Sequence, residues 1–83
     1  MTMQQKIEAA TRCVKALQRE GHEVLDVHMN LFEMRPVIEV APLPRCRELG
    51  GHVTRESLTR RHALGREMMT AIVNDCVIEW VHQ

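Results

Sequence analysis

Five histidines and three cysteines are the residues of this 83-residue chain that most readily bind metals, and their spacing decides whether they can. Cys46 and His52 are separated by five residues, and so are Cys76 and His82. Neither pair has the CxxC or HxxxH spacing that zinc sites in short chains use. If residues 76–82 form a strand, the ends of the second pair lie about 20 Å apart and cannot hold one ion. The sequence therefore predicts no metal site and no cofactor.

Motifs for catalysis are missing as well. The chain contains no GxSxG, no glycine-rich phosphate loop and no HExxH. His62 stands among arginines and could bind an anion, although a half-buried helix position is the simpler interpretation. Cys46 lies in a connecting segment and is the thiol expected to be most exposed, whereas Cys13 and Cys76 are expected to be small core residues. We expect no enzyme, and a cryptic enzyme that uses Cys46 or His62 is kept as an alternative.

Arginines are concentrated between residues 45 and 66, where six of them stand against two glutamates. Clustered positive charge is enough for phosphate contacts, so this group is a candidate for binding nucleic acid, or else a solvated face. The formal net charge of the chain is zero, and stacking on bases is disfavoured because only Phe32 and Trp80 carry aromatic rings. The candidate contacts are Arg45, Arg47, Arg55, Arg60, Arg61 and Arg66.

The composition indicates one small domain, residues 1–83, without a membrane segment. Apolar residues make up 45% of the chain, yet no apolar stretch approaches the roughly 18 to 20 residues that span a bilayer. The N-terminus lacks a basic region followed by an apolar run, so we expect no secretory signal. The expected location is the cytoplasm, where the three cysteines would be thiols.

The elements that must position these residues begin with a helix. Thr2 and Gln5 have the spacing of a capping box, and Gly21 suits a left-handed residue after a helix that ends near Glu20. The predicted buried stripe, with Cys13 beside it, consists of Ile7, Ala10, Val14 and Leu17.

A hairpin is expected to follow the helix. Leu25, Val27, Met29 and Leu31 alternate with polar residues, which is the period of a half-buried strand. After a bend comes a second strand in the segment "RPVIEVAP", and Pro42 and Pro44 end it. The side chains expected to face the helices are Leu25, Val27, Ile38 and Val40.

A second helix is predicted from Thr54, with Asn74 and Asp75 as its stop. Its buried side would consist of Leu58, Leu64, Met68, Met69 and Ile72. The tail "CVIEWVHQ" is predicted to be a strand because valine, isoleucine and tryptophan favour extended structure. Cys76, Ile78 and Trp80 would then face the core.

These elements predict an α+β domain of order α-β-β-α-β, a two-layer sandwich in which two helices cover one face of a three-stranded sheet. The last strand could run parallel to one strand of the hairpin. The uncovered face would be acidic with apolar patches, and it is either a solvated face or a surface for a partner. It would carry Asp26, His28, Val37, Glu39, Val77, Glu79 and Val81.

The "RPVIEVAP" strand, the loop that contains Cys46 and the terminal "CVIEW" resemble small accessory proteins of tailed phages and prophages over most of the chain. Accessory phage proteins of this size commonly bind and block a host protein, and some inhibit CRISPR or other defence systems. The resemblance carries no functional residue. It implies a non-enzymatic protein that acts by protein–protein contact through an edge strand or an open sheet face. The partner would be a host or phage protein or a second copy of the chain, with the nucleic-acid binder as the alternative.

Overall fold

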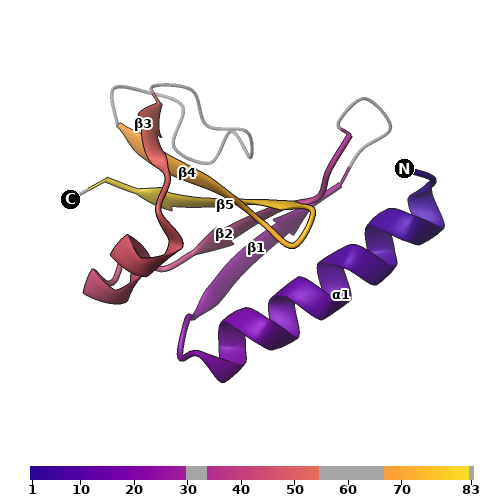
Figure 1. The fold of residues 1–83 in the computed structure, drawn as a ribbon, viewed down its shortest axis with the longest axis horizontal. Coiled ribbons are helices and arrows are strands. Elements are labelled where there is room, and N and C mark those ends of the chain that lie inside the picture. The colour runs from indigo at the N-terminus through magenta and orange to yellow at the C-terminus, as the bar shows by residue number, and fades with distance from the viewer. Residues whose placement is uncertain (30–33, 55–66, 83) are drawn as a thin grey trace.

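A computed structural model describes residues 1–29, 34–54 and 67–82. Within these ranges one α-helix packs on a five-stranded mixed sheet, and a short 3-10 helix follows the second strand (Figure 1). The α+β class is confirmed, but the sheet has more strands than predicted. The elements are α1 (Met3–Arg19), β1 (Val24–His28), β2 (Val37–Val40), η1 (Pro44–Leu49), β3 (His52–Thr54), β4 (Met68–Val73) and β5 (Cys76–Val81).

The strands lie in the order β1-β2-β5-β4-β3. β1 and β2 form the predicted antiparallel hairpin, and β5 runs parallel to β2 in the centre of the sheet. β4 pairs antiparallel with β5 on its other side, and β3 pairs antiparallel with β4. The strand predicted for the tail is therefore confirmed, as is its parallel alignment with one strand of the hairpin.

Residues 68–73 were predicted to be helical, and this is wrong, because they form β4. Asn74 and Asp75 have φ of 48° and 65°, so two consecutive residues in the left-handed region join β4 to β5, as in a type I′ turn. Asparagine and aspartate tolerate this region better than other residues with a Cβ. The pair that resembles a helix stop therefore closes a hairpin. Thr54 ends β3 instead of starting a helix, and residues 55–66 of that helix lie outside the described residues.

Helix α1 begins and ends as its sequence predicts. The Thr2 hydroxyl accepts a hydrogen bond from the backbone N–H of Gln5, and the Gln5 side chain accepts one from the N–H of Thr2. Gly21 has a φ of 89°, and the N–H of His22 donates to the carbonyl of Leu17 at 2.9 Å. These bonds satisfy backbone groups that a helix end leaves without partners.

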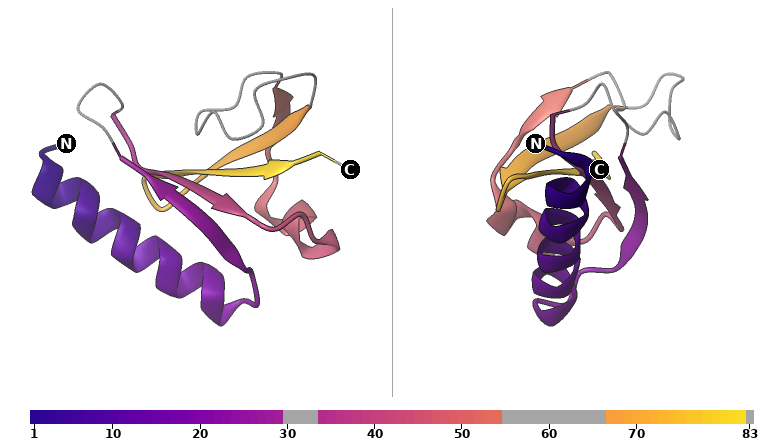
Figure 2. Two further views of the ribbon diagram at one scale, coloured as in Figure 1. Left: turned by 180° about the vertical axis from the view of Figure 1, so that it is seen from behind. Right: turned by 90° about the vertical axis from the view of Figure 1, so that its right-hand side faces the viewer.

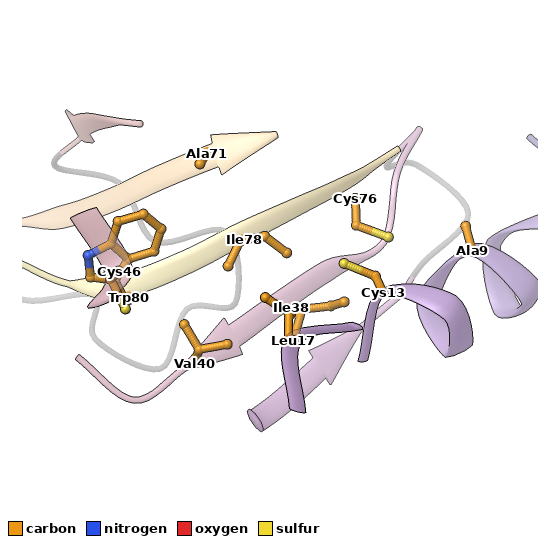
Figure 3. Close-up of a cluster of buried hydrophobic side chains, with 10 residues drawn as sticks. All are labelled: Ala9, Cys13, Leu17, Ile38, Val40, Cys46, Ala71, Cys76, Ile78 and Trp80. Carbon is orange, nitrogen blue, oxygen red and sulfur yellow. The ribbon is translucent and has the colours of Figure 1, made fainter. Parts of the chain in front are cut away.

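One face of the sheet, which we call the α1 face, packs against α1 (Figure 2). Lys6 is 5% exposed while Ile7 is 45% exposed, so the helix is rotated from the predicted stripe. A lysine can occupy such a position because its methylene stem is apolar. The core shown in Figure 3 consists of Ala9, Cys13, Leu17, Ile38, Val40, Cys46, Ala71, Cys76, Ile78 and Trp80.

Candidate functional site

An open apolar groove, here called the α1–β1 groove, lies between the helix and the strand at one edge of the sheet. Its volume is about 370 Å³. Of the described residues that line it, Lys15 alone carries a charge, and the walls are mostly aliphatic. The groove is lined by Ile7, Ala10, Thr11, Val14, Lys15, Gln18, Val27 and Met29.

The groove exposes apolar side chains from both of its walls. Ile7 on α1 is 45% exposed and Val27 on β1 is 38% exposed, and Met3, one turn before Ile7, is 38% exposed. Val14 is only partly buried and packs at the border of the core. The apolar stripe of α1 is therefore wider than the part of it that the sheet buries. The apolar residues of α1 that stay exposed lie over the groove.

A bulge in β1 shapes this edge. Val24 pairs with Val40, and the next pair is Asp26 with Glu39, so Leu25 is an additional residue in β1. We predicted Leu25 on the covered face, but it is 41% exposed, and Val24 takes the position opposite Val40. A bulge increases the local twist of an edge strand and turns side chains to new directions. In the described part of the chain β1 has a strand neighbour on one side only.

The residues predicted for the uncovered face do share one face, which we call the far face. Asp26 pairs with Glu39, and Glu39 pairs with Glu79, so three carboxylates form a row across β1, β2 and β5. His28, Val37 and Val77 form the neighbouring row. The alternation in the sequence thus placed them correctly relative to one another.

The far face is not exposed as expected, however. Val37 and Glu39 are each 1% exposed and Glu79 is 0% exposed, whereas Asp26, His28, Val77 and Val81 are partly buried. The prediction that Val37, Glu39 and Glu79 lie open to solvent is wrong. Buried carboxylates require polar partners. Glu39 and Glu79 both have interaction partners, although Oε1 of Glu39 accepts no hydrogen bond from the described residues. A role for these seven residues in binding stays a prediction.

The candidate arginines divide into three cases. The Arg45 guanidinium donates to the backbone carbonyl of Glu20, the C-cap of α1, where a cation is favourable to the helix dipole. Arg45 therefore has a structural role. Arg47 is exposed on η1. Arg55, Arg60, Arg61 and Arg66 lie outside the described residues, so nucleic-acid binding stays a prediction, and His62 falls in the same segment.

Cys46 is buried, not exposed as predicted. It is 1% exposed, its Sγ lies 3.9 Å from Nδ1 of His22, and the thiol donates to the carbonyl of Ala41 at 3.5 Å. His22 is itself only 5% exposed. The interactions of Cys46 are therefore those of a packed core thiol.

Cys13 and Cys76 are core residues, as predicted, and their thiol groups face one another between α1 and β5 (Figure 3). Both are free thiols, and that of Cys13 donates to the carbonyl of Val73 at 3.8 Å. Burial raises the pKa of Cys76 to about 12, with a contribution from the neighbouring Cys13, and burial also raises the pKa of Cys13. Both remain protonated and unreactive near neutral pH.

Residues 1–29, 34–54 and 67–82 contain no group of three or more histidine, cysteine, aspartate or glutamate side chains placed to hold a metal ion. Over the same ranges, none of the helices has the length and apolar character needed to cross a bilayer. The polar groups of the groove are those of Thr11, Lys15 and Gln18, and no histidine, cysteine or carboxylate is among the described residues that line it. Its lining is mostly aliphatic, and the groove is open to solvent.

The sequence profile of the Kil protein family matches residues 1–81, nearly the whole chain. The chain belongs to the Kil protein family. This makes it a small phage protein, which confirms the resemblance to phage accessory proteins. No curated protein and no solved structure matches the chain. For this Kil-family protein, the groove and the edge strand are thus the features on which a function can be argued.

Proposed function

We propose that this Kil-family protein acts without catalysis, by binding a host or phage protein through the α1–β1 groove and the edge of β1. The observation that carries the proposal is that Ile7 and Val27 line one groove from two different elements and are 45% and 38% exposed. A chain of this size has few apolar residues beyond those its core needs. Exposed ones gathered in a groove mark a contact surface.

The physical mode is the addition of a strand to the edge of the sheet. An edge strand presents unpaired backbone groups to a partner, and an adjacent groove can receive alternate side chains of the added strand. A partner segment that is extended and apolar fits both features. Fully burying an exposed aliphatic side chain contributes about 1.5–3 kcal/mol. Ile7 and Val27 are 45% and 38% exposed, so covering each contributes roughly 0.5–1.5 kcal/mol, and several such contacts give measurable affinity after the cost of association.

Blocking the bound protein is the activity we propose for this contact, and a host defence protein is one such target. The phage origin of the family supports this choice. A second copy of the chain would use the same edge of β1, and it is the competing occupant. The two differ in a measurable property, because a homodimer forms in the purified protein and a complex with a host protein does not.

The test is a pull-down from host-cell extract with the tagged protein and matched variants. Val27→Lys and Ile7→Glu place a charge in the groove and should reduce the captured partner by about tenfold or more. Val53→Lys is the control, because Val53 is 46% exposed on the opposite edge strand, β3. Thermal unfolding verifies that every variant is folded.

Equal capture by the groove variants and the wild type would reject the groove as the contact surface. Sedimentation of the purified chain separates the occupants, since a dimer that Val27→Lys dissociates and Val53→Lys does not would identify the second copy. Mixing with duplex and single-stranded DNA over a salt series tests the nucleic-acid alternative. We expect no binding that strengthens as salt is lowered.

A further inference from the structure

We propose that a second site binds the C-terminal residue of a protein segment when that residue is apolar. The site, here called the Trp80 pocket, shares no lining residue with the α1–β1 groove, so this inference does not rest on the proposed function. Its volume is about 330 Å³. The pocket is lined by Pro42, Leu43, Pro44, Cys46, Arg47, Met69, Trp80, Val81 and His82.

The walls of the Trp80 pocket come from segments far apart in the sequence. Pro42 and Pro44 bracket the exit from β2 into η1, and Met69 and Trp80 are paired residues of β4 and β5. Two proline rings and an indole ring make these walls rigid. The size is at the lower end of the range for ligand pockets. It suits one side chain with its backbone rather than a cofactor.

Trp80 is the lining residue of this pocket that carries an indole N–H donor. The residue is 6% exposed, and its indole nitrogen lies on the side of the ring away from Ile78 (Figure 3). Among the described residues, none accepts a hydrogen bond from its Nε1. Largely buried indole N–H groups usually have an acceptor. A ligand oxygen would supply one.

Arg47 supplies the charge at the same pocket. Its side chain is exposed on η1, and in the described part of the chain no carboxylate pairs with it. This distinguishes Arg47 from Arg45, which is held by the carbonyl of Glu20. His82 is the other polar residue at the pocket, with Nδ1 3.5 Å from Oε2 of Glu67. A guanidinium and an N–H donor together are suited to a carboxylate.

These features select one class of ligand. The donors of Arg47 and Trp80 favour a carboxylate, and the faces of Pro42, Leu43 and Met69 favour an apolar side chain. In so small a pocket, the carboxylate and the apolar side chain of the ligand fit most simply when one residue carries both. The last residue of a chain does so, because its α-carboxylate and side chain share one Cα, and the C-terminal carboxylate of a chain is a recurring target of recognition.

The test uses N-acetyl-leucine as the probe and the fluorescence of Trp80, the one tryptophan in the chain. We expect a saturable change in Trp80 emission, with a Kd in the millimolar range, as is usual for so small a ligand. N-acetyl-leucinamide lacks the carboxylate and should bind at least about tenfold more weakly, and acetate lacks the side chain and should bind equally weakly.

Variants locate the site. Arg47→Gln should weaken N-acetyl-leucine binding by about tenfold, while Arg35→Gln, an exposed arginine just before the opposite end of β2, should leave it unchanged. Trp80→Phe keeps a ring and removes the donor, and binding to it is followed by amide NMR shifts at Met69 and His82. Equal affinity for the amide, or no saturable change with the acid, would overturn the proposal, and so would an unchanged affinity of Arg47→Gln.

Discussion

Replacing Gly51 with alanine should destabilise the protein more than the same change at Gly50. Both glycines have positive φ, 75° at Gly50 and 97° at Gly51, where an L side chain is strained. Their surroundings differ. A Cβ at Gly50 would meet nothing within 4 Å, whereas a Cβ at Gly51 would lie 2.5 Å from the carbonyl oxygen of Thr70. The two variants therefore separate backbone strain from a steric clash.

The size of each effect follows from these contacts. Gly50 has φ 75° and ψ −137°, a backbone region that residues with a Cβ rarely adopt. An alanine there costs roughly 1–3 kcal/mol, and the lower entropy of alanine in the unfolded chain offsets roughly 0.5–1 kcal/mol of it. Gly50→Ala should thus lower the free energy of unfolding by about 1 kcal/mol. Thr70 pairs with both His52 and Glu79, so its carbonyl cannot move without disturbing two strands. The clash adds roughly 1–3 kcal/mol, and Gly51→Ala should lose about 2–4 kcal/mol.

Urea unfolding followed by Trp80 fluorescence measures both values. Trp80 is 6% exposed when folded, so its emission reports on the whole transition. At an unchanged m-value, the free energies of unfolding of the two variants should differ by at least about 1 kcal/mol. If both variants lose the same amount, the Thr70 carbonyl is able to yield, and the assignment of β3 as a tightly paired edge strand is refuted.

Two further predictions concern the core. Ile78→Ala should lower the free energy of unfolding by about 3–4 kcal/mol, because Ile78 is 0% exposed. Ile72 on the neighbouring strand is 65% exposed, so Ile72→Ala should cost less than about 1 kcal/mol. Equal losses of the two variants in urea unfolding would contradict the core described above. Stability should also fall above pH 9, because Cys13 and Cys76 have pKa values raised from 9.0, that of Cys76 to about 12. The contribution of Cys76 is fully present below pH 9 and is lost between about pH 9 and 12, by up to roughly 1.4 kcal/mol per pH unit, and that of Cys13 is likewise lost as the pH rises above 9. Urea unfolding at pH 8 and 10 measures this loss, which Cys76→Ala should reduce, and an identical pH dependence in that variant would count against the buried thiol.

The N-terminal third of the fold could be predicted because its signals are local. The capping box of Thr2 and Gln5 and the left-handed Gly21 act on backbone groups within a few residues. The alternation in β1 and β2 also predicted which residues share a face, except at Leu25, where the bulge shifts the register. At the other end of the chain, the β-forming residues of the tail predicted β5. These signals do not depend on the rest of the chain.

β4 could not be predicted because its sequence fits either type of element. Met68, Met69 and Ala71 favour helices, and Met68 and Ala71 point to opposite faces of the sheet yet are both buried. Because buried residues occur on both faces of β4, its sequence lacks the regular alternation that distinguishes a strand from a buried helix segment. The decisive signal was the Asn74–Asp75 turn, which is compatible with a helix end as well as with a hairpin.

For the candidate sites, the sequence predicted some of the residues involved but not how they come together. Ile7, Val14 and Val27 were recognised as apolar positions, but their exposure depends on the rotation of α1 and on the bulge at Leu25. Both are consequences of packing between elements, and neither has a local signature. The Trp80 pocket joins Pro42 to Trp80, and such proximity follows from the parallel pairing of β2 with β5.

The rotation of α1 links the fold to the proposed contact. With Ile7 turned inward, the helix would bury the whole of its predicted stripe and leave Lys6 in solvent, which is the arrangement that best serves the stability of the isolated chain. The structure instead buries Lys6 and exposes Ile7 beside Val27 on an edge strand. Since that arrangement leaves apolar area in water, a partner that covers the groove recovers free energy that the core does not provide. Binding and stability should therefore be coupled, and the partner should raise the unfolding temperature of the wild type more than that of Val27→Lys.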